Sequence, residues 1–303
     1  MHQSARSYGE LVERLVGWAE TRPDIRAAVI VGSRGRADHP ADEWADLDVV
    51  LVTTDKDRYL STTDWIRNIG SSLLTFLEPT ADGDEMERRV LFEGMLDVDF
   101  SIIPQETAHE LLRAGISRQT ARQIANTFGR GMRVLIDKDG VAERLRALVS
   151  SVGAMPPDRP TQHEFLEAVN DFLYHAVFTA KHLRRGELWW AGTCCNCHMQ
   201  RLLLRMIEWY ARVKHGWDYD TWFRGRFLEE WADPCALEGL REAFARYDKQ
   251  DVGRALLATM DLFRRTAIET ASKLGYQYPA DADEHVSEWV RDCFLTKETS
   301  NSR

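Results

Sequence analysis

The sequence lacks the features that would direct it to a membrane or a nucleic acid. No apolar run approaches the ~18 residues that a membrane-spanning helix needs, and the first residues lack the apolar stretch of a signal peptide. There is no basic excess either, because 39 Lys and Arg stand against 48 Asp and Glu, a net charge of −9. Nucleic-acid-binding proteins usually present a basic face. These absences predict a cytoplasmic protein that binds neither a membrane nor a nucleic acid.

Cysteine is scarce, and its pattern supports neither a disulfide framework nor a haem. The chain has five Cys, an odd number that a cytosolic protein keeps reduced. Residues 194–198, Cys-Cys-Asn-Cys-His, contain the spacing of c-type haem attachment, a chemistry of exported proteins. A structural zinc site would need a second ligand pair at short spacing, which the sequence does not offer. Residues 194–198 are therefore predicted to pack within a helix.

Two common glycine-rich nucleotide motifs are also missing. The segment 32–35, Gly-Ser-Arg-Gly, is not followed by Gly-Lys-Ser/Thr at the spacing of a P-loop. No Gly-x-Gly-x-x-Gly occurs, so a dinucleotide-binding fold is unsupported.

What the sequence does contain is a Gly-Ser turn between two strands, followed by a pair of carboxylates. Residues 25–31 and 47–53 are short, β-branched apolar runs, which read as buried strands. The backbone of Gly32-Ser33 can approach a phosphate closely. Asp46 and Asp48 are spaced by two, so a strand places both on one face, where they suit Mg²⁺. The alternative is an ordinary loop with a turn Asp.

A third strand, residues 96–103, carries two more acids. Asp97 and Asp99 share one face of this strand, while Val98 and Phe100 share the other. An acid in a core strand is costly unless it is paired or binds a metal, and the alternative is an edge strand with a wet face. Acids on two strands are what a two-metal phosphoryl-transfer centre needs.

With these motifs the chain resembles the DNA polymerase β-like nucleotidyltransferase superfamily and, within it, the streptomycin (aminoglycoside 6-) adenylyltransferase family. The resemblance spans residues 7–294 and rests on segments 32–34, 42–48, 98–104, 180–187 and 203–209. It implies an enzyme that moves AMP from ATP to a hydroxyl of a cationic aminoglycoside and releases pyrophosphate. Streptomycin is the leading candidate for the acceptor. Two Mg²⁺ ions are the expected cofactors.

The carboxylates receive the catalytic roles. Asp46 and Asp48 are expected as metal ligands, with Asp99 as the third. The acceptor hydroxyl must lose its proton, and a carboxylate is the usual agent. Asp99 is the candidate base, a ligand, or both, and Glu93 is a second candidate whose alternative is a solvated turn acid.

Nucleotide binding is expected from the turn and from one lysine. Gly32, Ser33 and the nearby backbone would hold the β- and γ-phosphates, with Arg34 or Arg36 adding positive charge. By resemblance, Lys181 would neutralise the triphosphate as a point charge. The alternative for Lys181 is a solvated position on a helix surface.

The sequence specifies the acceptor and the binding partners less closely than the nucleotide site. Another small alcohol or a protein could accept AMP, or the chain could be a catalytically silent nucleotide-binding regulator. The acidic charge suits a cationic acceptor, although solubility is the better explanation for most of these charges. Acid-aromatic segments at 218–220, 247–248 and 276–284 could contact such an acceptor, and none is singled out. A monomer or weak dimer is expected.

The predicted fold is an α+β (mixed sheet) nucleotidyltransferase domain, residues 1–150, followed by an all-α helical bundle domain, residues 151–303. Three prolines in the segment 150–160 mark the boundary. In the first domain we expect helices at 7–20 and 57–69, a hairpin of residues 88–92 and 96–103, and a strand at 132–136. In the second, a 3.6-residue apolar period predicts helices at 162–184, 187–213, 235–247, 250–274 and 283–295.

Overall fold

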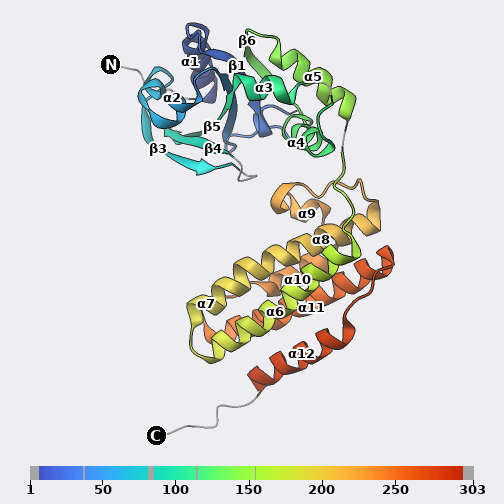
Figure 1. Ribbon diagram of the computed structural model, residues 1–303. Helices are drawn as coiled ribbons and strands as arrows, with labels where there is room; N and C mark the ends of the chain where they lie inside the picture. The colour runs from blue at the N-terminus through green and yellow to red at the C-terminus, as the bar shows by residue number, and fades with distance from the viewer. Residues whose placement is uncertain (1–6, 37, 81–84, 114, 154, 296–303) are drawn as a thin grey trace. The chain divides into compact units, whose positions relative to one another are not determined.

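The computed structural model describes residues 7–36, 38–80, 85–113, 115–153 and 155–295. The chain separates into two compact units, Met1–Met155 and Pro156–Arg303, and the division falls within the proline-containing segment. The first unit contains a mixed sheet with helices, and the second is helical (Figure 1). The predicted fold class is confirmed. Among the described residues no helix is both long enough and apolar enough to cross a membrane.

Over the residues that the structure describes, the sheet of the first unit has six strands in the order β3-β4-β5-β2-β1-β6. Their bounds are β1 Ile25–Val31, β2 Leu47–Thr53, β3 Ser72–Pro79, β4 Met86–Phe92, β5 Leu96–Pro104 and β6 Arg133–Asp137. β2 and β5 pair in parallel, and the other neighbours are antiparallel. The strands predicted around the Gly-Ser turn and the predicted hairpin are thus confirmed.

Helices pack on both faces of this sheet. They are α1 Tyr8–Glu20, α2 Lys56–Ser61, α3 Gln105–Leu111, α4 Arg118–Phe128 and α5 Val141–Val152, with short 3₁₀ turns η1 Gly32–Arg34 and η2 Asp64–Asn68. The main core joins α1, α2 and η2 to one sheet face, where Leu11, Trp65 and Phe100 are buried. Two smaller clusters join α3 and α5 to the other face. Side chains of one strand therefore alternate between two packed layers.

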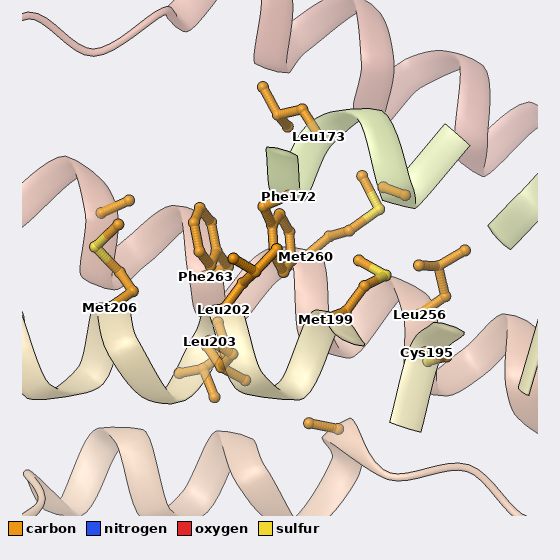
Figure 2. Close-up of a cluster of buried hydrophobic side chains, with 14 of the residues drawn as sticks. Phe172, Leu173, Cys195, Met199, Leu202, Leu203, Met206, Leu256, Met260 and Phe263 are labelled. Atoms are coloured by element: carbon orange, nitrogen blue, oxygen red, sulfur yellow. The ribbon is translucent and has the colours of Figure 1, made fainter. Parts of the chain in front are cut away.

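The second unit is a bundle built around long helices. Its elements are α6 Gln162–Arg184, α7 Leu188–Thr193, a π-helical turn η3 Cys194–Met199, α8 Gln200–His215, η4 Phe223–Gly225, α9 Leu228–Trp231, α10 Pro234–Ala243, α11 Lys249–Leu274 and α12 Ala280–Leu295. Its core includes Phe172 of α6 stacked on Phe263 of α11, with ring centroids 3.7 Å apart (Figure 2). Met199 and Leu202 fill the same layer from η3 and α8.

The start of α6 shows how local sequence fixes an element. Thr161 is the N-cap, and its hydroxyl accepts a hydrogen bond from the Glu164 N–H at 3.1 Å. The Glu164 carboxylate in turn accepts from the Thr161 N–H at 2.7 Å. This reciprocal capping box satisfies donors that a helix start leaves unpaired.

Several elements differ from the sequence prediction; the helix expected at 235–247, for example, ends at Ala243. The helix expected at 57–69 splits into α2 and η2, because Thr62 is extended and its hydroxyl bonds to the Arg58 carbonyl at 2.9 Å. The helix expected at 187–213 is interrupted by the π turn η3. Strand β3 was not predicted, because it lies at the sheet edge and its side chains are mostly exposed without apolar alternation.

Candidate active site

Three carboxylates from two neighbouring strands meet on one face of the sheet. Asp46 lies just before β2, Asp48 lies in β2, and Asp99 lies in β5. In the parallel β2–β5 pair, Asp48 is directly opposite Asp99. The oxygen atoms of all three that could bind a metal lie within 4.8 Å of one another. The structure thus brings together the three carboxylates that the sequence proposed as ligands.

The alternation of the strands explains why acids are tolerated here. Leu47 on β2 and Val98 and Phe100 on β5 are buried in the main core on the opposite face. Because side chains alternate along a strand, their neighbours Asp48 and Asp99 must project to the other side. The apolar residues anchor the strands and thereby fix the carboxylates.

Burial dominates the electrostatics of Asp99. Only 7% of this residue is exposed, and the loss of solvent raises the pKa of its carboxyl group to about 6. The Arg89 guanidinium opposes the shift, while the negative charges of Glu87 and Asp46 add to it. A group of carboxylates that disfavour one another's charge is a site that a cation would stabilise.

Arg89 is a site residue that the sequence reasoning missed. It forms ion pairs with Asp99 of β5, with Glu87 of its own strand at 2.9 Å and with Glu78 of β3 at 2.7 Å. Register was the available signal, because Arg89 is paired directly with Asp99 in the predicted hairpin. Arg89 therefore orients the Asp99 carboxylate from the neighbouring strand.

The Gly-Ser turn lies against the carboxylates. Gly32 has a φ of +64°, and a Cβ at this position would come within 2.0 Å of Oδ2 of Asp48. Only glycine permits this close approach. The neighbouring Ser33 hydroxyl is buried and has no hydrogen-bond partner among the described residues. A buried, unsatisfied hydroxyl is costly, so a ligand oxygen placed here would be stabilised.

Arg34 braces the loop that leads to Asp46. Its Nε donates to the Asp46 carbonyl at 2.9 Å, and its Nη2 donates to the Ala45 carbonyl at 2.6 Å. The guanidinium also stacks on the Tyr8 ring, 3.7 Å from its centroid. The Tyr8 hydroxyl donates to Asp97 at 2.7 Å, which ties α1 to β5. Arg34 is thus positioned to hold the backbone that carries a proposed ligand.

The remaining predicted residues have different surroundings. Arg36 lines a cavity of about 280 Å³ together with Ser33 and Arg34, next to the turn. Glu93 lies in the β4–β5 turn, where its N–H donates to the Ser71 carbonyl at 2.9 Å. Lys181 belongs to the helical unit, where it is exposed on α6 with its Nζ 5.8 Å from the centroid of the Trp289 ring.

The geometry defines what this site can do chemically. A set of three carboxylates offers only oxygen donors, the ligands that Mg²⁺ and similar hard cations prefer. Beside them lie a turn with a close backbone approach and an unsatisfied hydroxyl, features suited to a phosphate oxygen. The combination suits phosphoryl or nucleotidyl transfer.

Comparison with known proteins places the chain in a family. The family model described as streptomycin adenylyltransferase matches residues 5–293. An aminoglycoside 6-adenylyltransferase of Campylobacter jejuni is 25% identical over 292 residues, covering 94% of this chain and 95% of the relative. One of Bacillus subtilis strain 168 is 24% identical and covers 96% and 99%. A solved aminoglycoside 6-adenyltransferase structure from Bacillus subtilis is 20% identical, covers 96% of this chain and 100% of its own, and has a TM-score of 0.44.

Proposed function

Because this chain belongs to the streptomycin adenylyltransferase family, we propose that it transfers AMP from ATP to a hydroxyl group of an aminoglycoside, with streptomycin as the expected acceptor. Family membership confirms the resemblance seen in the sequence and makes the chain a nucleotidyltransferase. Its relatives are named aminoglycoside 6-adenylyltransferases, which supports this class of acceptor. The observation that carries the proposal is the cluster of Asp46, Asp48 and Asp99 against the turn at Gly32.

In the proposed reaction, an acceptor hydroxyl oxygen forms a bond to the α-phosphorus of ATP. The bond from this phosphorus to the bridging oxygen of the β-phosphate breaks, and pyrophosphate leaves. The hydroxyl proton must pass to a base. Asp99 is proposed for this role, because it is a carboxylate of the cluster and carboxylates are the usual agents of such a proton transfer.

The three carboxylates would hold Mg²⁺, two ions in our proposal, since their donors are all oxygens. When bound, the metal offsets the charge that develops on the attacking and leaving oxygens. Asp46 and Asp48 would act as ligands, and Asp99 would complete the set.

The nucleotide phosphates are proposed to lie on the Gly-Ser turn. The backbone at Gly32 and the Ser33 hydroxyl would contact the β- and γ-phosphates, and Arg36 would add positive charge. Arg34 would act mainly through the loop carbonyls that it already binds. Lys181 is also proposed to contact the triphosphate, and this role rests on the family resemblance alone.

A product analysis tests this function. Purified protein is incubated with ATP, Mg²⁺ and one aminoglycoside at a time, and the mixture is analysed by mass spectrometry, with EDTA-treated and ATP-free samples as controls. We expect an AMP adduct on streptomycin that is absent from both controls, and NMR of the product identifies the modified hydroxyl. An adduct on a different aminoglycoside corrects the acceptor. No adduct on any aminoglycoside overturns the proposal and favours another small alcohol, a protein substrate or a silent nucleotide binder.

A further inference from the structure

A second group of metal-ligating side chains lies within the helical unit, where α6 meets the π turn η3. Asp171 and His175 are one turn apart on α6, and His198 lies in η3. One ligand atom from each residue lies within 4.8 Å of the others. Nε2 of His198 is 3.0 Å and Nδ1 of His175 is 2.6 Å from Oδ1 of Asp171. Two imidazoles from separate segments thus converge on one carboxylate.

The core of the bundle holds this arrangement in place. A π turn contains an extra residue compared with an α-helical turn, and such turns often occur at functional sites. The neighbours of His198 in this turn, Cys195 and Met199, are fully buried against α6 and α11 (Figure 2). The Thr179 hydroxyl of α6 also contacts the Met199 sulfur at 3.7 Å. Packing on the inner side of η3 therefore fixes the position of His198 beside α6.

We propose that Asp171, His175 and His198 form a binding site for a divalent transition-metal cation such as Zn²⁺. Two imidazole nitrogens and one carboxylate oxygen are a ligand set that Zn²⁺ accepts in three-ligand sites, whereas Mg²⁺ and Ca²⁺ prefer oxygen alone. The three side chains are between 27% and 38% exposed, so a cation can enter and water can occupy a fourth position.

The site is separate from the proposed catalytic carboxylates in residues and in chemistry. It lies wholly within the second unit, whereas Asp46, Asp48 and Asp99 belong to the first. No sequence pattern indicates this site, because Asp171 and His175 lie more than twenty residues before His198. Only the packing of α6 against η3 brings the ligands together.

The proposal also predicts how a substitution of Arg201 changes the affinity for the metal. Its Nη2 lies 3.1 Å from Nδ1 of His198, so Nδ1 accepts a hydrogen bond and Nε2 carries the proton that faces Asp171. Binding of a metal through Nε2 must displace that proton, which leaves Nδ1 protonated and ends the contact with Arg201. Arg201 is exposed and can turn away. We expect Arg201→Ala to tighten metal binding, because it removes both a competing hydrogen bond and a positive charge.

The experiment is a titration of the full chain with Zn²⁺ by calorimetry, at neutral pH and with excess Mg²⁺. An Asp48→Asn background removes a ligand of the first carboxylate cluster, so that this cluster does not contribute. We expect one equivalent of Zn²⁺ to bind. His198→Asn and His175→Asn should each weaken binding at least about tenfold, while Arg201→Ala should strengthen it.

Two matched controls distinguish the proposed ligands from other donors. Cys197→Ser removes an exposed thiol from the same turn, and His285→Asn removes a surface histidine of α12. Both should bind Zn²⁺ as the parent does, and circular dichroism shows whether each variant keeps its helices. The proposal is overturned if Zn²⁺ does not bind, if folded His198→Asn and His175→Asn variants bind normally, or if Cys197→Ser abolishes binding. The first of these results would leave an imidazole–carboxylate cluster held by hydrogen bonds alone.

Discussion

Arg34 shows how a single side chain can control a proposed metal ligand without contacting the metal. It bonds to the carbonyls of Asp46 and Ala45, so its loss should let the loop before β2 move. We predict that Arg34→Ala lowers the rate of adenylyl transfer about 10–100-fold, the usual effect of losing a partner that orients a ligand. It should also raise the Mg²⁺ concentration needed for half-maximal rate, which a titration of the initial rate with Mg²⁺ measures.

Arg133→Ala is the control for this prediction. Arg133 of β6 lines the cavity of about 280 Å³ that Arg34 also lines. Its removal changes the local charge by as much as the removal of Arg34 does, but leaves the hydrogen bonds to the loop carbonyls intact. Equal Mg²⁺ requirements in the Arg34 and Arg133 variants would contradict the positioning role of Arg34.

Glu208 of α8 should make the stability of the helical unit depend on pH. Burial raises the pKa of its carboxyl group to about 7, although Arg212 and Arg205 oppose the shift. In the unfolded chain a Glu has a pKa of about 4.3, so between these values the folded state binds more protons than the unfolded state. The contribution of Glu208 to stability should therefore be full below pH ~4.3 and be lost as the pH rises to about 7.

Substitution by glutamine should remove this dependence. We expect Glu208→Gln to raise the free energy of unfolding of the helical unit by about 2 kcal/mol more at pH 8 than at pH 5, as measured by urea unfolding. Glu238→Gln, at an exposed position of α10, should show no such difference between the two pH values. An equal gain for Glu208→Gln at both pH values would show that the carboxyl group is ionised in the folded protein.

At the scale of elements, the Gly-Ser turn and strand β2 must approach each other closely. A Cβ on residue 32 would lie 2.0 Å from Oδ2 of Asp48, so either the turn or the carboxylate must move in Gly32→Ala. A displacement of ~1 Å near reacting groups costs about 100-fold in rate. We predict a loss of adenylyl transfer of at least this size, measured as kcat/KM for ATP.

Gly140→Ala separates this clash from the cost of the backbone conformation. Gly140 has a similar φ of +68°, but a Cβ there meets nothing within 4 Å. It should destabilise the first unit by about 1–2 kcal/mol and leave transfer unchanged. Similar activities for the Gly32 and Gly140 variants would mean that the contact with Asp48 does not matter.

Elements whose apolar residues recur at regular spacing were predictable, and elements whose conformation depends on tertiary packing were not. Strands β1 and β2 and helix α6 begin and end at or next to the predicted residues, because buried apolar side chains recur at regular spacing. The edge strand β3 has no such alternation, since its side chains are exposed on both faces. The π turn η3 gave no local signal either, because its conformation depends on packing against α6 and α11.

Some residues of the candidate site could likewise be predicted from the sequence, and others could not. Asp46, Asp48 and Asp99 were predicted because acids at the start or in the middle of apolar strands are unusual, and the structure brings them together. Arg89 was missed, because an arginine in a hairpin is ordinary until the strand register places it opposite Asp99. The bonds of Arg34 to loop carbonyls depend on the path of residues 42–46, which no residue pattern specifies.

For the whole molecule, the two units should fold independently. Each has its own apolar core, the sheet core around Phe100 and the bundle core around Phe172 and Phe263. We predict that a fragment of residues 156–303 is helical by circular dichroism and melts cooperatively, as a domain with its own core does. A fragment without a cooperative transition would show that the second unit depends on the first.

The central claim is that the carboxylate cluster performs nucleotidyl transfer, and one comparison of rates tests it most directly. Transfer of AMP to the preferred acceptor is measured for the parent protein, Asp48→Asn and Asp97→Asn at saturating ATP and Mg²⁺. Asp97 shares the face of Asp99 on β5, and an asparagine there can still accept the hydrogen bond from Tyr8.

We predict that Asp48→Asn lowers kcat about 1,000-fold or more, because a bound metal contributes several kcal/mol of transition-state stabilisation. Asp97→Asn should stay within a few-fold of the parent protein. A folded Asp48→Asn variant with the activity of the parent, or equal losses in the two variants, would contradict the assignment of the active site.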